Sequence, residues 1–281
     1  MTIKDKKIAI IGLGMLGGSY AQGFHDAGIK VTGIDIDPEA ISYAKEKGWI
    51  EKGGDDPALI SDCDIVISAL YPQSFVEWIR TNQHHFKENA LLSDVTGVKR
   101  KVIHEIDAIL RPDLEFIACH PMAGREYKGI AYADPSQFRQ ANFLIVPTEN
   151  NTEKAIETAR EIVDVLQFRN ISILSAEEHD RIIGFVSQLC HVIAISLMNI
   201  SDDPKLADYT GDSFRDLTRI ADINEDLWPE LFIYNKDNLL KEIDQLIDQL
   251  KEMHGLIETE DVESMKEKMV TATLRRRNFN K

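Results

Sequence analysis

The sequence predicts an α/β protein: a doubly wound, mostly parallel sheet over residues 1–173, followed by an all-α domain over residues 174–281. Short apolar segments suited to buried strands alternate with helical segments through the first part, which is the pattern of parallel sheets connected by helices. After residue 174 the strand pattern ends, and apolar residues recur at helical spacing. The expected strands lie at 8–11, 31–34, 64–69, 90–93, 115–118, 142–147 and about 170–174.

Glycines follow the first expected strand in a pattern typical of dinucleotide binding. The apolar run at 8–11 leads into Gly12-Leu13-Gly14-Met15-Leu16-Gly17, after which the chain can continue as a helix. In a Rossmann domain such glycines allow the turn and the close approach of a pyrophosphate to the helix N-terminus. Asp35 ends the second strand, where a carboxylate accepts the ribose hydroxyls and repels a 2′-phosphate. These residues predict NAD as the cofactor; a tight turn without a ligand is the alternative.

The composition is that of a globular protein without a nucleic-acid or membrane partner. The chain has 281 residues, of which 43% are hydrophobic and 28% are charged, and its net charge of −15 disfavours nucleic acid and acidic membranes. We expect no membrane span, because no apolar stretch approaches roughly 18–20 residues, and no signal peptide. Cys63, Cys119 and Cys190 lack metal-binding spacing and are expected to be reduced thiols in a cytoplasmic protein.

The second part of the chain is predicted to be helical throughout. Ser175 and Glu178 form a capping box, and residues 175–199 contain no proline, so we expect one long, mostly apolar and largely buried helix. Within 235–258, apolar residues spaced four and three apart form a heptad seam. Such a seam packs inside its own chain or against a second copy, and we favour a contact between two subunits. The seam residues are Leu239, Ile243, Leu246, Leu250, Met253 and Ile257.

A histidine follows the expected strand at 115–118. The segment His120-Pro121 lies at the carboxyl edge of the sheet, where open α/β folds bind their ligands. Because histidine titrates near neutral pH, His120 suits accepting a proton from a substrate hydroxyl while a hydride leaves the same carbon. A loop histidine that holds backbone groups is the alternative.

A second polar cluster lies in the helical part. Ser187 and His191 are four residues apart and share a helix face, as part of an internal hydrogen-bond network or of a pocket wall; we favour the network. Arg215 and Arg219 also share a face. An arginine there can hold a substrate carboxylate through two parallel hydrogen bonds, or it pairs with Asp216.

Five segments of the chain, taken together, resemble the prephenate dehydrogenase family, which includes the arogenate dehydrogenases. Their order and spacing are more specific than any one of them, and the resemblance covers nearly the whole chain. It implies an N-terminal Rossmann domain, a helical C-terminal domain that forms a homodimer, and NAD-dependent oxidative decarboxylation of prephenate to 4-hydroxyphenylpyruvate in tyrosine biosynthesis. The segments are GLGMLGGS at 12–19, DVTGVK at 94–99, HPMAGRE at 120–126, SQLCH at 187–191 and SFRDLTRIA at 213–221.

The resemblance also implies roles for single residues. His120 matches the catalytic histidine of the family, hydrogen-bonded to the substrate hydroxyl. Arg219 matches the arginine that binds a substrate carboxylate, and His191 matches a histidine of the substrate pocket. Glu126 and Asp216 match acidic residues that gate the pocket in some members.

The chain departs from the family pattern at two positions. Gly97 stands where many members have serine, so a hydroxyl contact to substrate or cofactor is missing or is supplied by Thr96. Arg125 stands where small hydroxyl residues are common. It either contacts a substrate carboxylate or pairs with a surface acid, and close to His120 it lowers the pKa of that histidine.

Other functions remain open at this point. An arogenate dehydrogenase or a dual-specificity cyclohexadienyl dehydrogenase uses the same chemistry, and Arg125 weakly favours the anionic keto-acid side chain of prephenate. A β-hydroxy-acid dehydrogenase is disfavoured, because it typically needs a catalytic lysine that residues 175–199 lack. A non-catalytic NAD-binding sensor is the alternative outside the enzymes. We expect no additional regulatory or mutase domain.

Overall fold

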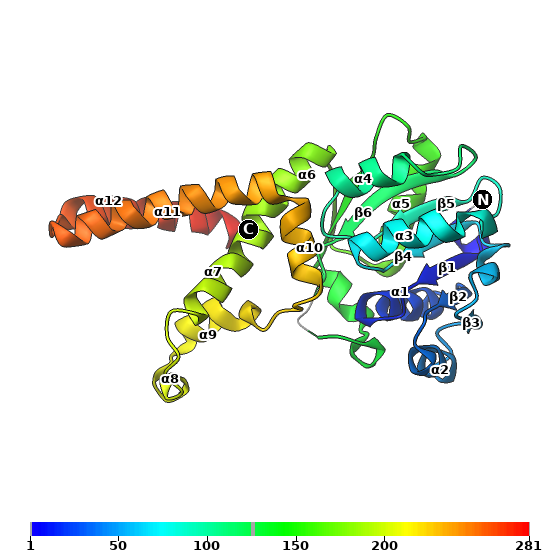
Figure 1. Cartoon of the computed structure of the whole chain (residues 1–281), viewed down its shortest axis with the longest axis horizontal. Coiled ribbons are helices and arrows are strands. Elements are labelled where there is room, and N and C mark those ends of the chain that lie inside the picture. Colours follow the sequence, from blue (N-terminus) through cyan, green and yellow to red (C-terminus); the bar gives the residue numbers. More distant parts are fainter. Residues whose placement is uncertain (1, 125–126, 281) are drawn as a thin grey trace. The chain divides into compact units, whose positions relative to one another are not determined.

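The computed structural model describes residues 2–124 and 127–280. Within them the strands form an eight-stranded sheet in the order β3-β2-β1-β4-β5-β6-β7-β8 (Figure 1). Neighbouring strands pair in parallel from β3 to β6; β7 runs antiparallel to β6, and β8 runs parallel to β7. The predicted doubly wound, mostly parallel sheet is therefore confirmed. The strands are β1 (Ile8–Ile11), β2 (Val31–Ile34), β3 (Lys52–Gly54), β4 (Ile65–Ser68), β5 (Leu91–Asp94), β6 (Glu115–Pro121), β7 (Asn142–Val146) and β8 (Asn170–Ile173).

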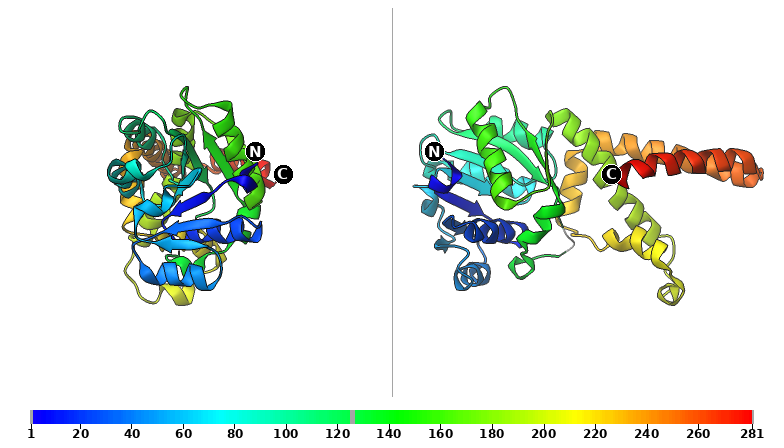
Figure 2. Two further views of the ribbon diagram at one scale, coloured as in Figure 1. Left: turned by 90° about the vertical axis from the view of Figure 1, so that its right-hand side faces the viewer. Right: turned by 180° about the vertical axis from the view of Figure 1, so that it is seen from behind.

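Helices cover both faces of the sheet (Figures 1 and 2). Alternate residues of β1 belong to two separate apolar cores: Ile8 and Ile10 to one, Ala9 and Ile11 to the other. α1 and α5 pack on the first face, with Phe24 and Ile162 buried there, whereas α3 and α4 pack on the second. Burial on both faces explains why these strands are continuously apolar. The helices are α1 (Met15–Asp26), α2 (Pro38–Glu46), α3 (Pro72–Asn82), α4 (Arg100–Asp107) and α5 (Glu153–Leu166).

Two features of the sheet differ from the prediction. β3 was not expected, because its sequence, Lys-Gly-Gly, has no apolar run; it is an edge strand of three residues paired with β2. β6 extends to Pro121, three residues beyond the expected end at 118, so His120 lies within the strand. The antiparallel pairing of His120 with Leu144 of β7 prolongs β6 beyond the predicted end.

The chain divides into two compact units, Met1–Asn235 and Lys236–Lys281. The first unit includes the helical segments up to α10, so it extends beyond the expected boundary at 173/174, and that boundary remains a prediction. These segments are α6 (Ala176–Ile183), the π-helical turn η6 (Gly184–Gln188), α7 (Leu189–Met198), α8 (Leu206–Tyr209), α9 (Asp212–Thr218), the 3₁₀ turn η7 (Arg219–Ala221) and α10 (Leu227–Tyr234).

α6, η6 and α7 follow one another without a break, as expected for 175–199, and the predicted capping box of Ser175 and Glu178 is present. Among the described residues this 23-residue helix alone is long and apolar enough to cross a membrane, and the mean hydropathy of its most apolar 18-residue window is 1.7. The expectation that no stretch reaches this length is therefore wrong. A single such helix is weak evidence for a membrane span, because core helices pass the same test.

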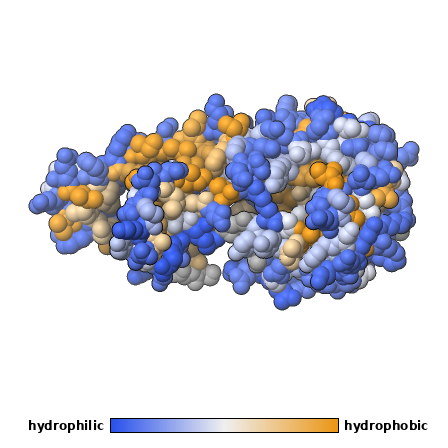
Figure 3. All heavy atoms as spheres, turned by 60° about the horizontal axis from the view of Figure 1, so that its bottom comes forward, coloured by the Kyte–Doolittle hydropathy of each residue, from blue (hydrophilic) through white to orange (hydrophobic). Residues whose placement is uncertain are grey.

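The expectation that this helix is largely buried is also wrong. Only 28% of its most apolar window is buried, and Phe185 is 57% exposed. His179 and Asp180 near its beginning are buried and hydrogen-bonded, whereas Phe185, Val186 and Met198 are exposed. Figure 3 shows apolar side chains gathered on the surface of the helical part of the chain.

The second unit consists of α11 (Lys236–Glu258), α12 (Val262–Arg277) and the 3₁₀ turn η8 (Asn278–Asn280). An ion pair of 2.6 Å between Lys268 and Glu252 joins the two long helices. The heptad seam lies on α11 as expected, but Leu250 and Ile257 are each 60% exposed. The helical hairpin alone therefore does not cover its own apolar seam.

Candidate active site

A cavity of about 640 Å³ lies at the carboxyl ends of β1, β4, β5 and β6, and residues of η6, α7, η7 and α10 complete its wall. Ligands bind at this edge in open α/β folds. The cavity brings together predicted cofactor and substrate residues that are far apart in the sequence. The predicted residues among its lining are Gly14, Met15, Leu16, Gly17, Thr96, His120, His191 and Arg219.

The glycine turn has the shape that a bound pyrophosphate requires. Gly12 has a φ of +89°, and a Cβ on Gly17 would lie 1.8 Å from the carbonyl oxygen of Gly12, so neither position accommodates a side chain. A Cβ on Gly14 would meet no atom within 4 Å, so the backbone there is open to a ligand. Gly14 is also the N-cap of α1, whose first N–H groups have no partner within the helix. The turn therefore fits an anionic dinucleotide.

Gly12 and Leu13 of this turn, and Asp35 beside it, are not among the residues that line the cavity. The Asp35 carboxylate accepts hydrogen bonds from the N–H of Leu13 at 2.5 Å and from the N–H of Asp37 at 2.8 Å. Asp35 is half-buried, and a carboxylate offers about four lone-pair positions, so two acceptor positions remain for ribose hydroxyls. Asp35 thus ties the glycine turn to the end of β2 and still suits the cofactor role predicted for it.

A buried ion pair lies beneath the cavity, at the end of β5. Lys99 Nζ is 2.6 Å from Asp94 Oδ2, and both side chains are fully buried. The Thr96 hydroxyl donates to the same carboxylate and accepts from Lys99 Nζ at 3.1 Å. Asp94 Oδ1 also accepts the N–H of Cys119, which fixes the backbone of β6 directly before His120. Thr96 lines the cavity, but its hydroxyl proton is already donated within the protein, so the substrate contact expected of it stays a prediction.

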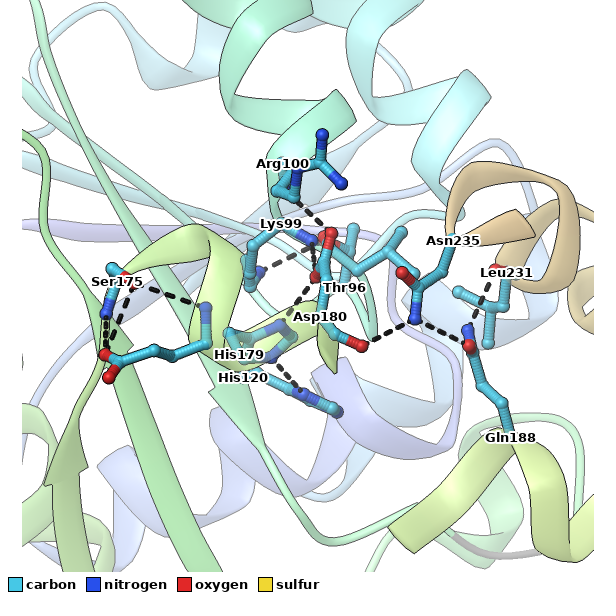
Figure 4. A network of polar contacts seen from close by, with 12 residues as sticks. Thr96, Lys99, Arg100, His120, Ser175, His179, Asp180, Gln188, Leu231 and Asn235 are labelled. Carbon is cyan, nitrogen blue, oxygen red and sulfur yellow. Dashed lines mark hydrogen bonds and ion pairs between the residues drawn. The ribbon is translucent and has the colours of Figure 1, made fainter. Parts of the chain in front are cut away.

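His120 belongs to a chain of polar contacts that leads away from the cavity (Figure 4). Its Nδ1 lies 2.9 Å from His179 Nε2, and His179 Nδ1 lies 2.8 Å from Asp180 Oδ1. Burial, the neighbouring His179 and the positive charge of Lys99 hold the pKa of His120 well below its ordinary value. Burial also lowers the pKa of His179, although Asp180 acts in the opposite direction. Both rings are therefore neutral at physiological pH.

Asp180 joins the helical wall to the sheet domain. Its carboxylate accepts the N–H of Lys99 at 2.8 Å and the N–H of Arg100 at 3.0 Å, so it caps the N-terminus of α4 from another element. Asn235 donates to the Asp180 carbonyl oxygen at 2.7 Å and to Gln188 Oε1 at 2.8 Å. These contacts hold α6, α4 and the end of α10 together around His179.

The opposite wall of the cavity carries His191 and Arg219. His191 stacks on Trp228 with ring centroids 3.6 Å apart, and its Nδ1 is 3.0 Å from the carbonyl oxygen of Ser187. Ser187, His191 and Trp228 all line the cavity. The polar cluster of Ser187 and His191 is therefore part of a pocket wall and not only the internal hydrogen-bond network that we favoured. Arg219 lines the cavity from η7. The π-helical turn η6 carries Ser187, and such turns are frequent at functional sites.

The remaining predicted residues do not join the described site. Arg215 pairs with Asp212 at 2.5 Å, not with Asp216, and lies outside the cavity lining, as does Asp216. Arg125 and Glu126 lie outside the described residues. The expectation that Arg125 lowers the pKa of His120 therefore stays a prediction. Among the described residues, the low pKa of His120 results from burial and from the neighbouring His179 and Lys99.

Sequence reasoning missed the buried partners beneath His120. Asp94 and Lys99 lie within the segment DVTGVK, but neither residue was given a role. His179 and Asp180 lie within a run of five polar residues, Glu177 to Arg181, near the beginning of the helix, so the sequence alone does not set them apart. Their burial, which the structure shows, is what distinguishes them, because polar groups are buried only where they have hydrogen-bonding partners.

Comparisons with known proteins agree with this geometry. Residues 21–171 match the family model described as the nucleotide-binding domain of prephenate dehydrogenase, and residues 175–271 match its dimerization domain. The chain is 27% identical over 267 residues to the prephenate dehydrogenase of Bacillus subtilis (strain 168), covering 92% of this chain and 72% of that protein. It is 30% identical over 256 residues to that of Lactococcus lactis subsp. cremoris (strain MG1363), covering 88% of this chain and 70% of that protein.

A solved structure is similar over almost its full length. The prephenate dehydrogenase of Aquifex aeolicus, in complex with hydroxyphenyl propionate and NAD⁺, superposes with a TM-score of 0.89 at 28% identity and covers 98% of both chains. The match extends over the sheet and the helical part alike. The chain belongs to the prephenate dehydrogenase family.

Proposed function

We propose that this protein catalyses the NAD-dependent oxidative decarboxylation of prephenate to 4-hydroxyphenylpyruvate, a step of tyrosine biosynthesis. The observation that carries the proposal is that a single cavity joins the glycine turn at the N-terminus of α1 to His120 and Arg219. This arrangement suits a substrate that has a hydroxyl to be oxidised and a carboxylate to be held.

His120 is proposed as the catalytic base. A neutral imidazole at the cavity wall takes the proton of the substrate hydroxyl as that group becomes a carbonyl. The low pKa of His120 keeps this imidazole neutral near pH 7. NAD supplies the acceptor for the hydride when it is bound at the glycine turn.

Arg219 and His191 are proposed as substrate-binding residues. The guanidinium of Arg219 can bind a carboxylate through two charge-assisted hydrogen bonds, which fixes its orientation as well as its position. His191, whose ring packs against Trp228 with the two planes tilted by 31°, forms a polar wall of the pocket. The apolar residues Leu227, Trp228 and Leu231 of α10 suit the ring of the substrate. Holding the ring and the hydride acceptor in line lowers the entropic part of the barrier.

NADH formation with prephenate and with L-arogenate, each paired with NAD and with NADP, tests the proposal. We expect turnover with prephenate and NAD, and its loss by orders of magnitude in His120→Asn while NAD binding persists. Turnover with L-arogenate alone would favour an arogenate dehydrogenase, and turnover with both would favour a cyclohexadienyl dehydrogenase. Activity confined to NADP would contradict the role of Asp35. NAD binding without turnover of either substrate would favour a sensor.

We also propose that the protein is a cytoplasmic homodimer. Exposed apolar side chains lie on α11, and others lie on η6 and α7, and a second copy of the same helices would cover them. Sedimentation equilibrium at several protein concentrations tests the dimer. A monomer at all concentrations would contradict it.

A further inference from the structure

The hydrogen-bond partners determine which ring nitrogens of His120 and His179 carry a proton. Each oxygen of the Asp180 carboxylate accepts a backbone N–H group, so the carboxylate is the acceptor at this end of the contacts. His179 Nδ1, 2.8 Å from Asp180, must therefore carry a proton. Since His179 is neutral, its Nε2 has none and accepts a hydrogen bond from His120 Nδ1 at 2.9 Å. His120 is neutral as well, so its Nε2 carries a lone pair.

The lone pair of His120 Nε2 faces the cavity. A Cβ built on Gly97, which lines the cavity, would lie 3.8 Å from His120 Nε2. The other ring nitrogen points away from the cavity, into the interior (Figure 4). The nitrogen that meets a ligand is thus the one that can accept a proton.

We propose that His179 is a positioning residue of the reaction: held by Asp180, it fixes His120 in the tautomer whose Nε2 is unprotonated. This inference rests on the proposed function, in which His120 is the base. An imidazole without an acceptor at Nδ1 carries its proton mainly on Nε2, and His120 in that form would meet the substrate hydroxyl as a donor. His179 removes this unproductive form.

The same contacts act when His120 takes the proton. Both nitrogens of His120 are then protonated, and the Nδ1–H bond to His179 Nε2 is strengthened by the positive charge. His179 is in turn oriented by the negative charge of Asp180, and Lys99 balances the charge of Asp94 nearby. In a catalytic triad a carboxylate orients the base directly, whereas here a second imidazole, that of His179, lies between the base His120 and the carboxylate of Asp180.

Two substitutions of His179 distinguish the positioning of His120 from a role of His179 in packing alone. His179→Leu keeps an apolar side chain of similar size and removes the acceptor, whereas the Oε1 of His179→Gln can accept from His120 Nδ1. We expect His179→Leu to lower kcat by about 10- to 100-fold, as is usual for groups that orient a reactive side chain, with the KM for prephenate and the Kd for NAD nearly unchanged. His179→Gln should recover a large part of kcat. His104→Leu, on the exposed side of α4, is the matched control.

The tautomer itself is measured by ¹⁵N NMR of protein labelled in histidine, with the His120 signals assigned from the His120→Asn variant. We expect Nε2 of His120 to be unprotonated in the wild type and in His179→Gln, and protonated in His179→Leu. A protonated Nε2 in the wild type, or an unchanged kcat in a folded His179→Leu, would overturn the inference. If His179→Leu does not fold, failure of folded His179→Gln to keep the wild-type tautomer overturns it. The NMR result does not depend on turnover, so a wild type without activity contradicts the proposed function alone.

Discussion

Replacing Lys99 by methionine removes one partner of the buried ion pair beneath the site. Lys99 Nζ lies 2.6 Å from Asp94, and neither side chain is exposed. Removing one member of such a pair typically costs about 3–5 kcal/mol, because the other charge stays buried. Asp94 keeps its hydrogen bonds from Cys119 and Thr96, so we expect the lower end, about 3 kcal/mol. For a domain of this size that lowers the Tm by roughly 6–12 °C.

Thermal and urea unfolding followed by circular dichroism measure this loss, at a single protein concentration because dimerisation is linked to stability. The matched control is Lys87→Met, which breaks an ion pair of the same 2.6 Å length with side chains 47% and 22% exposed, and should cost at most about 1 kcal/mol. The double variant Asp94→Asn/Lys99→Met should be more stable than Lys99→Met, because no buried charge remains. A Lys99→Met variant as stable as Lys87→Met would refute the reasoning.

Three further predictions concern the site. Because His120 must be neutral to act and its pKa is well below 6.5, kcat/KM should stay level from pH 8 through 6.5 and fall only at lower pH; half-loss at or above 6.5 would contradict this. Gly17→Ala should destabilise the fold, since the new Cβ meets the Gly12 carbonyl oxygen. Gly14→Ala should keep the Tm and raise the Kd for NAD about tenfold or more. Calorimetry of unfolding and of NAD binding distinguishes the two effects. Arg219→Ala should raise the KM for prephenate about tenfold or more, with Arg215→Ala as a control that leaves steady-state kinetics unchanged.

The fold could be predicted from the sequence to the extent that local patterns determine it. Strands buried on both faces are runs of apolar residues, so β1 and β4 are evident in the sequence. β3 has no such run, and only its pairing with β2 makes it a strand. The exposure of α7 could not be inferred either. An apolar helix is buried against something, but its sequence does not say whether that partner lies in the same chain.

Those parts of the site could be predicted in which a single residue type at a single position has a characteristic chemical or conformational role. The glycine turn has a backbone geometry that only glycine permits, and His120 stands at a sheet edge where ligands bind. The partners of His120 were not predictable in the same way. Lys99 and Asp180 are 81 positions apart, and their hydrogen bond exists only because α6 packs on the start of α4. Such pairings follow from tertiary packing and leave only a faint local signal.

Asp180 contributes both to the stability of the fold and to the orientation of the proposed base. A substitution at a different residue is therefore needed to test the orientation alone. One carboxylate caps α4 and also orients His179. A substitution at Asp180 therefore removes a helix cap, worth about 1 kcal/mol in typical cases, together with the orientation of the base. His179 has a single partner on each side in this chain of contacts, His120 and Asp180. Changing His179 leaves in place the two hydrogen bonds that Asp180 accepts at the N-terminus of α4. A loss of turnover in a His179 variant therefore reports on the orientation of His120 and not on the fold.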